Sequence, residues 1–421
     1  MSQVEIATNG LVPLAQLSLR EPEEDAATKA TFNGRLVANR VYMKHGHFGK
    51  KGAKIDQKML LSPMQLRDKM AKIRQAQAPK DFHVSFATAP LSFVGGKVSF
   101  RNMSSDEPNR VYLMTKNAFR QAARLVTGVH EGNFLLDTSD IKINGKTEVG
   151  ERTATAAWAL WSTSDEQRKK LSLCRTANMN LGGQSTPVVR AFLSPDFATY
   201  DNIQFMEAIL KSKLLTEDHR LVQAIVSDDH MRLRFVAARN LTEMQAKKPV
   251  PMFEIWNSET GHRRVFIRAG TFTLVCTNGL HHWSSDAEYS WRHYGSMTRI
   301  ENGVEAALKQ LSPFSHQIVA AYKQAMEITA DDLLGWVNDH LDYMKAGLGF
   351  RKAVNDLIIK GDETSTLSPQ GRPCLASAID AVTMIAQNLE MNDQFDAERW
   401  AGSLLARGIS EQQNNRIVFD V

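Results

Sequence analysis

Short connections between strand-like segments in the middle of the chain place the strongest limit on its fold. Leu221–Val226 and Met231–Val236 are joined by a four-residue turn, and Phe253–Trp256 and Arg264–Ile267 form a second closely spaced pair. Connections this short join antiparallel neighbours, because parallel strands need a crossover of about a dozen residues or more. The sequence therefore predicts an α+β fold with a central, mostly antiparallel sheet, flanking helices and a helical C-terminal region.

Helix-start signals lie before this segment. Ser62 and Gln65 bracket Pro63 in the pattern of a capping box, and Asp201 with Gln204 repeats that pattern. A hydroxyl or carboxylate at the N-cap and a Gln three residues later satisfy free N–H groups, so a helix is expected at each place. The apolar face expected for the second helix consists of Ile203, Met206, Leu210 and Leu214.

Composition and pattern divide the chain into four regions. We expect an acidic, loosely ordered N-terminus over 1–30, a basic arm and helix over 31–80, an α+β core over 81–299 and a helical region over 300–421. Within the arm, the glycine-rich stretch 35–58 is typical of a loop or an irregular hairpin. Two further helices are expected, one over 152–172 and one that begins at Ser312-Pro313.

The net charge of +5 conceals an uneven distribution. Residues 31–130 contain 18 Lys and Arg against 5 Asp and Glu, a local net charge of +13. Residues 300–421 contain 10 Lys and Arg against 17 Asp and Glu, a local net charge of −7. An ordinary protein surface mixes positive and negative side chains, whereas residues 31–130 are dominated by positive ones. This region therefore favours an anionic partner.

The densest cations lie in the basic arm, where aromatic side chains are interleaved with them. Cations neutralise phosphates and aromatic faces stack on unpaired bases, so the pattern predicts contact with single-stranded nucleic acid. The alternative is a solvated loop without a ligand. The arm residues assigned to this site are Arg35, Arg40, Tyr42, Lys44, Phe48, Lys50, Lys51, Lys54 and Lys58.

Arginines in the β-rich middle of the chain extend the hypothesis. Arg232 and Arg234 share one face of a strand because side chains alternate with a period of two. Arg264 and Arg268 lie on a neighbouring predicted strand. We expect these four residues to continue the nucleic-acid surface on a basic sheet face, and the alternative is a solvated edge strand.

Other classes of site have weaker support. The three cysteines are far apart and odd in number, which argues against a disulfide framework and for a reducing compartment. No apolar run approaches the ~18 residues of a membrane span, and the first residues lack the pattern of a secretory signal. We therefore expect a cytoplasmic protein without membrane contact. Complete nucleotide-binding loops and zinc-type spacings are missing, so no cofactor and no metal are predicted.

One group of residues is compatible with a catalytic site. Cys276 ends an expected strand over 272–276, and His281 and His282 follow it closely. A small buried thiol is the simpler interpretation, so no catalytic residue is assigned and an enzyme is the less favoured class. The aromatic run from Trp291 to Tyr294 fits either a base-stacking surface or a cover over the core.

Several segments resemble a known family. Val275-Cys276-Thr277-Asn278-Gly279-Leu280 and the preceding turn Asn257–His262 resemble the signature of the phage/plasmid-like protein family, domain of unknown function 932. Softer similarities lie at 115–125, 189–202 and 378–383, so the resemblance covers about 80–405. It implies a cytoplasmic protein of a phage, plasmid or integrated element. It implies no catalytic residues, and the densest basic run precedes the resembling span.

Together these observations predict a nucleic-acid-binding protein of a mobile element, with single-stranded DNA binding or annealing in recombination or replication as the leading function. A homo-oligomer would suit annealing. One alternative is a protein-binding counter-defence or regulatory factor that uses 300–421 to contact a host or element protein. Another is an enzyme centred on Cys276, His281 and His282.

Overall fold

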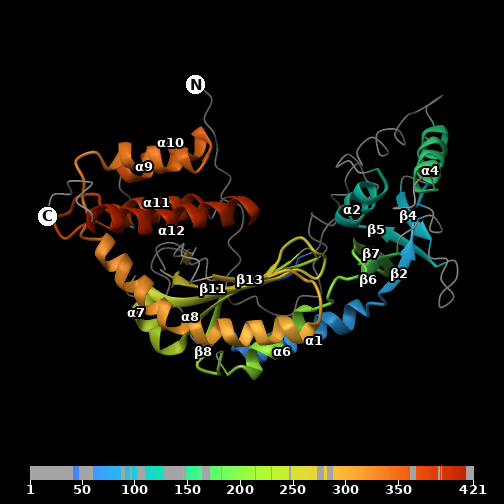
Figure 1. The fold of residues 1–421 in the computed structure, drawn as a ribbon, viewed down its shortest axis with the longest axis horizontal. Helices are drawn as coiled ribbons and strands as arrows, with labels where there is room; N and C mark the ends of the chain where they lie inside the picture. The colour runs from blue at the N-terminus through green and yellow to red at the C-terminus, as the bar shows by residue number, and fades with distance from the viewer. Residues whose placement is uncertain are drawn as a thin grey trace.

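The structure is a computed structural model of the chain. It describes residues 41–46, 60–86, 91–94, 97–101, 110–127, 146, 148–163, 171–181, 183–213, 215–228, 230–245, 248–272, 279–281, 288–360, 367–386, 389 and 391–413. Figure 1 shows an elongated molecule with a central sheet, a second sheet at one end and a group of helices at the other. The predicted α+β class, with mostly antiparallel sheets and C-terminal helices, is confirmed.

The N-terminal sheet lies at one end of the molecule, and its six strands have the order β2-β6-β7-β5-β4-β3. Its strands are β2 (Phe82–Ser85), β3 (Leu91–Val94), β4 (Lys97–Arg101), β5 (Val111–Met114), β6 (Leu171–Leu181) and β7 (Gln184–Leu193). All neighbours pair antiparallel except β5 and β7, which are parallel. Helices α2 (Lys116–Thr127) and α4 (Glu148–Thr163) pack on this sheet, and Phe119, Phe192 and Trp158 share its hydrophobic cluster.

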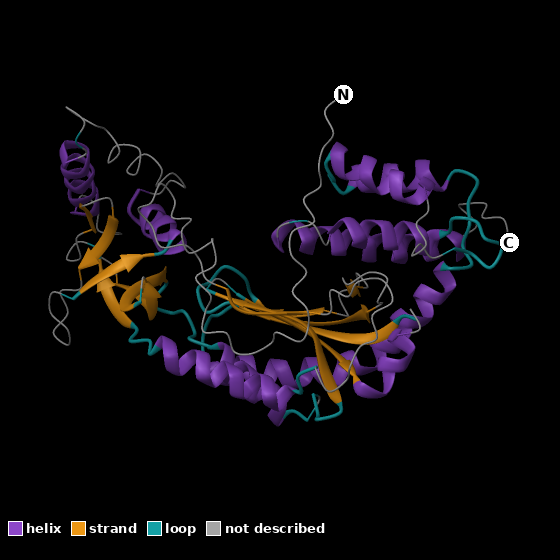
Figure 2. Ribbon diagram, turned by 180° about the vertical axis from the view of Figure 1, so that it is seen from behind, coloured by secondary structure: helices purple, strands orange, loops and turns teal. Residues whose placement is uncertain are grey.

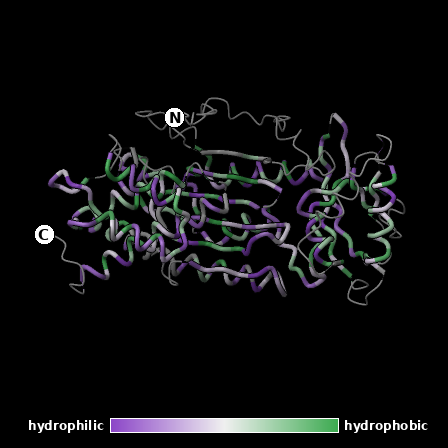
Figure 3. Tube along the Cα trace, turned by 90° about the horizontal axis from the view of Figure 1, so that it is seen from above, coloured by the Kyte–Doolittle hydropathy of each residue, from purple (hydrophilic) through white to green (hydrophobic). Residues whose placement is uncertain are grey.

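The central sheet has the order β1-β8-β9-β10-β11-β12, and β13 also pairs with β11. Its strands are β1 (Val41–Gly46), β8 (His219–Ser227), β9 (Met231–Ala237), β10 (Val250–Asn257), β11 (Val265–Phe272), β12 (Gly279–His281) and β13 (Glu288–Trp291). The two strand pairs predicted from short turns are confirmed as the antiparallel neighbours β8–β9 and β10–β11. Figure 3 shows the two sheets as separate groups along the long axis.

Alternation gives the central sheet two different faces. Leu233 and Phe235 of β9 join the main hydrophobic cluster, so the intervening Arg232 and Arg234 lie on the opposite face. Helices α1 (Pro63–Gln77), α6 (Asn202–Lys211) and α8 (Met297–Ala325) contribute to the apolar side. On the opposite face, Arg232 and Arg234 contact Glu398 of the C-terminal helices.

The capping boxes predicted at the starts of two helices are both present. The Ser62 hydroxyl accepts a hydrogen bond from the Gln65 amide, and the Gln65 side chain accepts one from the Ser62 amide. Asp201 and Gln204 form the equivalent box at α6. The predicted apolar face of α6 is partly wrong, because its buried residues are Asn202, Phe205, Met206 and Ile209, whereas Ile203 and Leu210 are half-buried and Leu214 lies outside the described residues.

A C-terminal helical unit completes the described fold, and Figure 2 shows it rising from the end of α8. It consists of α9 (Leu333–Tyr343), α10 (Leu348–Lys360), α11 (Leu375–Ala386) and α12 (Met391–Gln413). The short elements η5 (Ala238–Asn240) and α7 (Leu241–Gln245) connect β9 to β10. The helical unit has a hydrophobic cluster of its own, which includes Val337, Ile379 and Leu404.

Three sequence-based expectations differ from the structure. The helix expected over 152–172 ends at Thr163, and Leu171 begins the long strand β6. The polar residues of β6 obscure its strand pattern, since Arg175 and Thr176 are buried there with polar partners. The helix expected from Ser312 is the second half of the continuous helix α8. Part of the stretch 35–58, expected as a loop or an irregular hairpin, is strand β1, which pairs with the remote strand β8, and local composition does not reveal that partner.

Candidate nucleic-acid interface

The predicted arm site lies mostly outside the described residues. Arg35, Arg40, Phe48, Lys50, Lys51, Lys54 and Lys58 all belong to this undescribed part. Tyr42 and Lys44 lie on β1, where the backbone of Lys44 is the register partner of Ile225 on β8. The arm's contribution to binding therefore stays a prediction, and its described strand adds one edge to the central sheet.

The arginines predicted for a basic sheet face require a correction. Arg232 and Arg234 share one face of β9, as expected, and Arg268 of β11 lies on the same face. However, the three side chains are at most 2% exposed, so the prediction that they form a solvent-facing surface is wrong. β9 is also an interior strand between β8 and β10, which excludes the alternative of a solvated edge strand.

Two glutamates neutralise these arginines, and the five residues are called the arginine–glutamate cluster here. Glu254 of β10 lies in register between Arg234 and Arg268 and accepts hydrogen bonds from Nε of both, at 3.2 and 2.7 Å. Glu398 of α12 accepts from Arg234 Nη2 at 2.5 Å and from Arg268 Nη2 at 3.3 Å. Arg232 bridges Glu254 and Glu398 with Nε and Nη2.

The arginine–glutamate cluster extends to two further groups. Arg234 Nη1 donates to Gln223 Oε1 of β8 at 2.6 Å, and Glu288 of β13 lies 3.9 Å from Arg268 Nη1. The Arg232 guanidinium lies 5.0 Å from the centre of the Trp256 ring. Charged groups taken out of water are costly unless they are paired and hydrogen-bonded, which this geometry provides. The arrangement joins five strands and one helix in a single electrostatic contact.

A second group of buried ions joins the two sheets. Arg190 of β7 donates from Nη1 to Glu259 Oε2 at 2.9 Å and from Nη2 to the carbonyl of Asp228 at 3.0 Å. Its Nε lies 3.3 Å from a carboxylate oxygen of Asp228. Glu259 also accepts from the Asn202 amide at the start of α6, at 2.8 Å.

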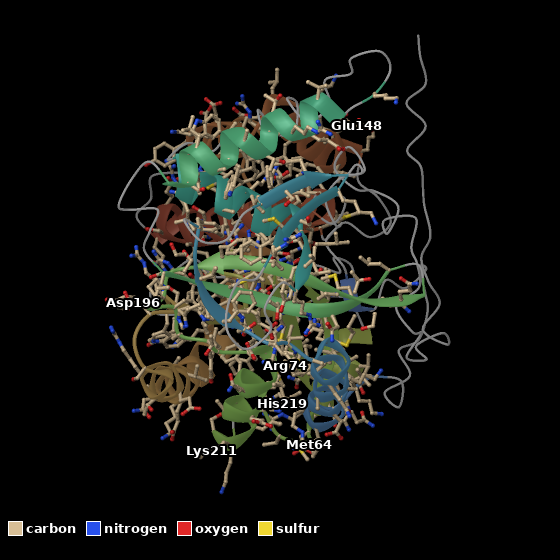
Figure 4. All side chains as sticks on the ribbon, turned by 90° about the vertical axis from the view of Figure 1, so that its right-hand side faces the viewer. Met64, Arg74, Glu148, Asp196, Lys211 and His219 are labelled. Carbon is tan, nitrogen blue, oxygen red and sulfur yellow. The ribbon has the colours of Figure 1, made fainter. Side chains whose placement is uncertain are left out.

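A neighbouring chain of ions continues along the junction. Arg175 of β6 contacts Asp81 at 2.9 Å and Asp201 at 2.5 Å, and Arg74 of α1 contacts the second oxygen of Asp201 at 2.5 Å. Figure 4 shows Arg74 at the end of α1 beneath the strands. A small pocket here is lined by Arg74, Arg190 and Glu259 among other residues. The charges that line it are committed to ion pairs, which indicates a structural junction.

Exposed cations lie above this junction, where the β10–β11 hairpin turns. Val265 of β11 is the register partner of Trp291 of β13, so Arg264 and Arg292 lie side by side just beyond the paired residues. Both arginines are exposed, as is His262. Tyr294, two residues after Arg292, is 60% exposed. Of the four arginines predicted on the sheet, Arg264 is therefore the one that faces solvent.

Helix α2 carries further exposed cations close to this hairpin. Gln121 donates to the carbonyl of Thr260 at 2.9 Å, which fixes α2 against the hairpin turn (Figure 1). Arg120 and Arg124 are exposed and one helical turn apart, so they share a face. The sequence of α2 contains no acidic residue. The junction surface, defined as Arg120, Arg124, Arg264, Arg292 and Tyr294, thus combines cations of helix α2 and of residues next to β11 and β13 with an exposed ring.

Other aromatic residues of the run 291–294 cover the core, which resolves the alternatives left by the sequence. Trp291 packs against the main hydrophobic cluster. His293 is buried, stacks on Phe197 at a ring-centre distance of 4.7 Å, and hydrogen-bonds the carbonyl of Ala198 through Nδ1 at 3.2 Å. Burial disfavours the charged imidazolium and lowers the pKa of His293 to about 4. Tyr294 alone of these three faces solvent.

The alternative of an enzyme gains no support from the described residues. Cys276 and His282 lie outside them, and His281 is described only as a backbone partner of Gly270 in β12. Cys174 and Cys374 are buried, and burial raises the pKa of both thiols, which disfavours a reactive thiolate. Within the described ranges, no group of three or more His, Cys, Asp or Glu side chains is arranged to hold a metal ion.

Sequence reasoning missed the acidic partners of these arginines. Glu254 carried a signal, since a glutamate at an inward position of an apolar strand needs a cation nearby. Glu398, Glu259 and Asp201 carried none, because their partners lie on elements remote in the sequence. The exposed pair on α2 was also missed, although Arg120 and Arg124 at a spacing of four on the polar side of an amphipathic helix could have revealed it.

Comparison of the chain with protein-family models, curated proteins and solved structures finds no match in any of the three. The resemblance to the phage/plasmid-like family therefore stays a prediction. None of the described helices combines the length and the apolar composition that crossing a membrane requires.

Proposed function

We propose that this chain binds single-stranded DNA across the junction surface, and that the basic arm adds to the same track. The observation that carries this proposal is the placement of the exposed Arg264 and Arg292 beside the exposed Tyr294. Guanidinium groups bind phosphates bidentately, and an exposed ring offers a face on which an unpaired base can stack. Arg120 and Arg124 lengthen the track along α2.

Charge at the junction supports the same function. The carboxylates of Asp228 and Glu259 are buried and paired with Arg190, so they do not oppose the exposed arginines at the surface. Asp196, one residue before Phe197, is an exposed acid near this region. A stoichiometric binding role needs no catalytic group. Annealing of complementary strands, the leading hypothesis from the sequence, is part of this proposal.

The test is salt-dependent binding of a fluorescently labelled oligo-dT of about 20 nucleotides. Each phosphate contact contributes about −0.7 to the slope of log K against log salt for a single strand. We therefore expect the variant R120S/R124S, and separately R264S/R292S, to bind more weakly and to show a slope shallower by about 1.4. The control variant K352S/K360S removes the same charge from α10 and should retain the wild-type curve.

A second variant tests the stacking surface. Tyr294→Ala should weaken oligo-dT binding by ~1–3 kcal/mol, because one base loses its aromatic partner. Binding of a duplex of equal length should change little, since its bases are already stacked. Wild-type protein that showed no salt-sensitive binding, or arginine variants that matched K352S/K360S, would overturn the proposed function.

The protein-binding alternative stays a prediction. Tyr343 and Leu348, on either side of the turn between α9 and α10, are 80% and 76% exposed. Large exposed apolar side chains near each other are common at contact sites.

A further inference from the structure

A charged contact links the C-terminal helical unit to the central sheet, beside the contacts of α11 and α12 with β12 and the continuous helix α8. Among the described residues, the unit's hydrophobic cluster contains members of α8, α9, α10, α11 and α12 and of their connections, and no member of a strand. Glu398 of α12 is fully buried against Arg232, Arg234 and Arg268 of the sheet. The helical unit therefore has a core of its own and meets the arginine face of the sheet through a carboxylate.

Both oxygens of Glu398 are used in this contact. Oε1 accepts from Arg234, and Oε2 accepts from Arg232 and Arg268. Three guanidinium groups that converge on one two-oxygen anion form the arrangement by which proteins recognise phosphate as well as carboxylate. The sheet supplies Glu254 as the second carboxylate, and Glu288 lies 3.9 Å from Arg268 at the margin.

Removal of Glu398 would leave three arginines on the sheet against Glu254 and the partly exposed Glu288. The docked arrangement, in which Glu398 lies among the three arginines, gains little net stability from these ion pairs. The cost of removing the charges from water offsets much of their attraction. Water or a phosphate can then replace the carboxylate. Burial, with a further contribution from the neighbouring Arg234, lowers the pKa of Arg232, whereas Glu254 and Glu398 raise the pKa of Arg234.

We propose that Arg232, Arg234 and Arg268 form a phosphodiester-binding site that Glu398 occupies in cis, so that docking of the C-terminal helical unit and binding of a nucleic-acid strand compete. This inference rests on the proposed function, because it assigns a second set of phosphate contacts to the same ligand. The acidic helical unit thereby limits access to the sheet. A bound strand that extends from the junction surface displaces Glu398 and reaches the three arginines.

The first experiment compares Glu398→Gln with a matched variant on the same helix. Asp396→Asn also removes one negative charge from α12, but Asp396 is exposed and lies outside the arginine–glutamate cluster. We expect E398Q to bind labelled oligo-dT at least about tenfold more tightly, with a salt slope steeper by up to about 2 for three new phosphate contacts. D396N should follow the wild-type curve.

A second readout does not depend on nucleic acid. Tyr343→Cys on the helical unit and Leu160→Cys on α4 place two exposed thiols on opposite ends of the molecule for fluorescent labels (Figure 1), with Cys276→Ser in the background. Cys174 and Cys374 are buried and resist labelling. The efficiency of energy transfer between the two labels should change when Glu398→Gln is introduced in the absence of nucleic acid. In wild-type protein it should change on addition of oligo-dT. The same phosphate concentration as inorganic pyrophosphate should have little effect.

The outcomes separate the two proposals. Wild-type binding to oligo-dT with no difference between wild type, E398Q and D396N in affinity, slope or label distance would overturn this inference and leave the proposed function intact. An equal response to pyrophosphate would also overturn it, because the site would then recognise small phosphates. Absence of wild-type binding overturns the proposed function itself. If E398Q fails to fold, Glu398→Asp retains the charge on a shorter stem and should give an intermediate gain, and an unchanged affinity would count against the inference.

Discussion

Arg234 and Glu398 lie 164 residues apart in the sequence, yet Nη2 of the arginine and Oε1 of the glutamate are 2.5 Å apart. Both side chains are fully buried. This contact brings the C-terminal helical unit onto the arginine face of the central sheet. It also removes from the surface the arginines that the sequence pattern assigned to a ligand.

Glu254 should be the residue on which the arginine–glutamate cluster depends most. It contacts all three arginines from a central strand, so Glu254→Ala leaves three buried cations with Glu398 and the partly exposed Glu288. We expect the free energy of unfolding to fall by about 3–5 kcal/mol, the range for one partner lost from a buried ion pair. Urea denaturation followed by circular dichroism measures this change. Glu305→Ala, at an exposed position of α8, should change the stability little, because water screens its ion pair with Lys309. An equal effect of the two substitutions would contradict the assignment.

Arg190 should hold the two sheets together. Substitution by Met keeps an unbranched apolar stem but leaves Asp228 and Glu259 buried without this cation. We expect a loss of about 3 kcal/mol in stability. The unfolding of the N-terminal sheet should also separate from that of the central sheet, because each has its own hydrophobic cluster. Differential scanning calorimetry would show a second transition in R190M, and a single unshifted transition would refute this role.

The lowered pKa of His293 predicts that the folded protein loses stability in mild acid. This pKa is lowered from 6.5 to about 4 in the folded protein, so between these values the unfolded state binds a proton that the folded state does not. Stability therefore rises with pH across this window, and about 3 kcal/mol is lost as the pH falls from 6.5 to 4. His293→Phe keeps the stacking on Phe197 and should flatten this part of the profile. The exposed His262→Gln variant should retain the wild-type slope, and a profile unaltered by H293F would exclude the mechanism.

Gly303 should be sensitive to the smallest side chain. A Cβ atom at this position of α8 would lie 2.4 Å from Nε1 of Trp291, a ring that packs on the main core. Gly303→Ala should destabilise the protein by about 1–3 kcal/mol, because the indole must move. Gly347→Ala is the matched control, since its Cβ would have no neighbour within 4 Å. Thermal melts of the two variants measure the difference, and equal melting temperatures would contradict the packing.

Local signals in the sequence predicted much of the fold. Strand alternation and short turns identified β8 to β11, and the capping boxes at Ser62 and Asp201 located the starts of α1 and α6. These features depend on residues a few positions apart, so the sequence displays them directly. Strand β6 was missed because its buried Arg175 and Thr176 resemble a polar segment until their partners are known.

By itself, the sequence determined the fold class, the order of the main elements and the shared face of Arg232 and Arg234. The tertiary structure decided what that face contacts. It buried these arginines against Glu254 and Glu398 and left Arg264 and Arg292 beside Tyr294 at the surface. The physical reason is that a charged side chain is stable either in water or beside an opposite charge. Local periodicity determines the direction in which a charged side chain points, whereas long-range packing of the chain supplies the opposite charge beside it.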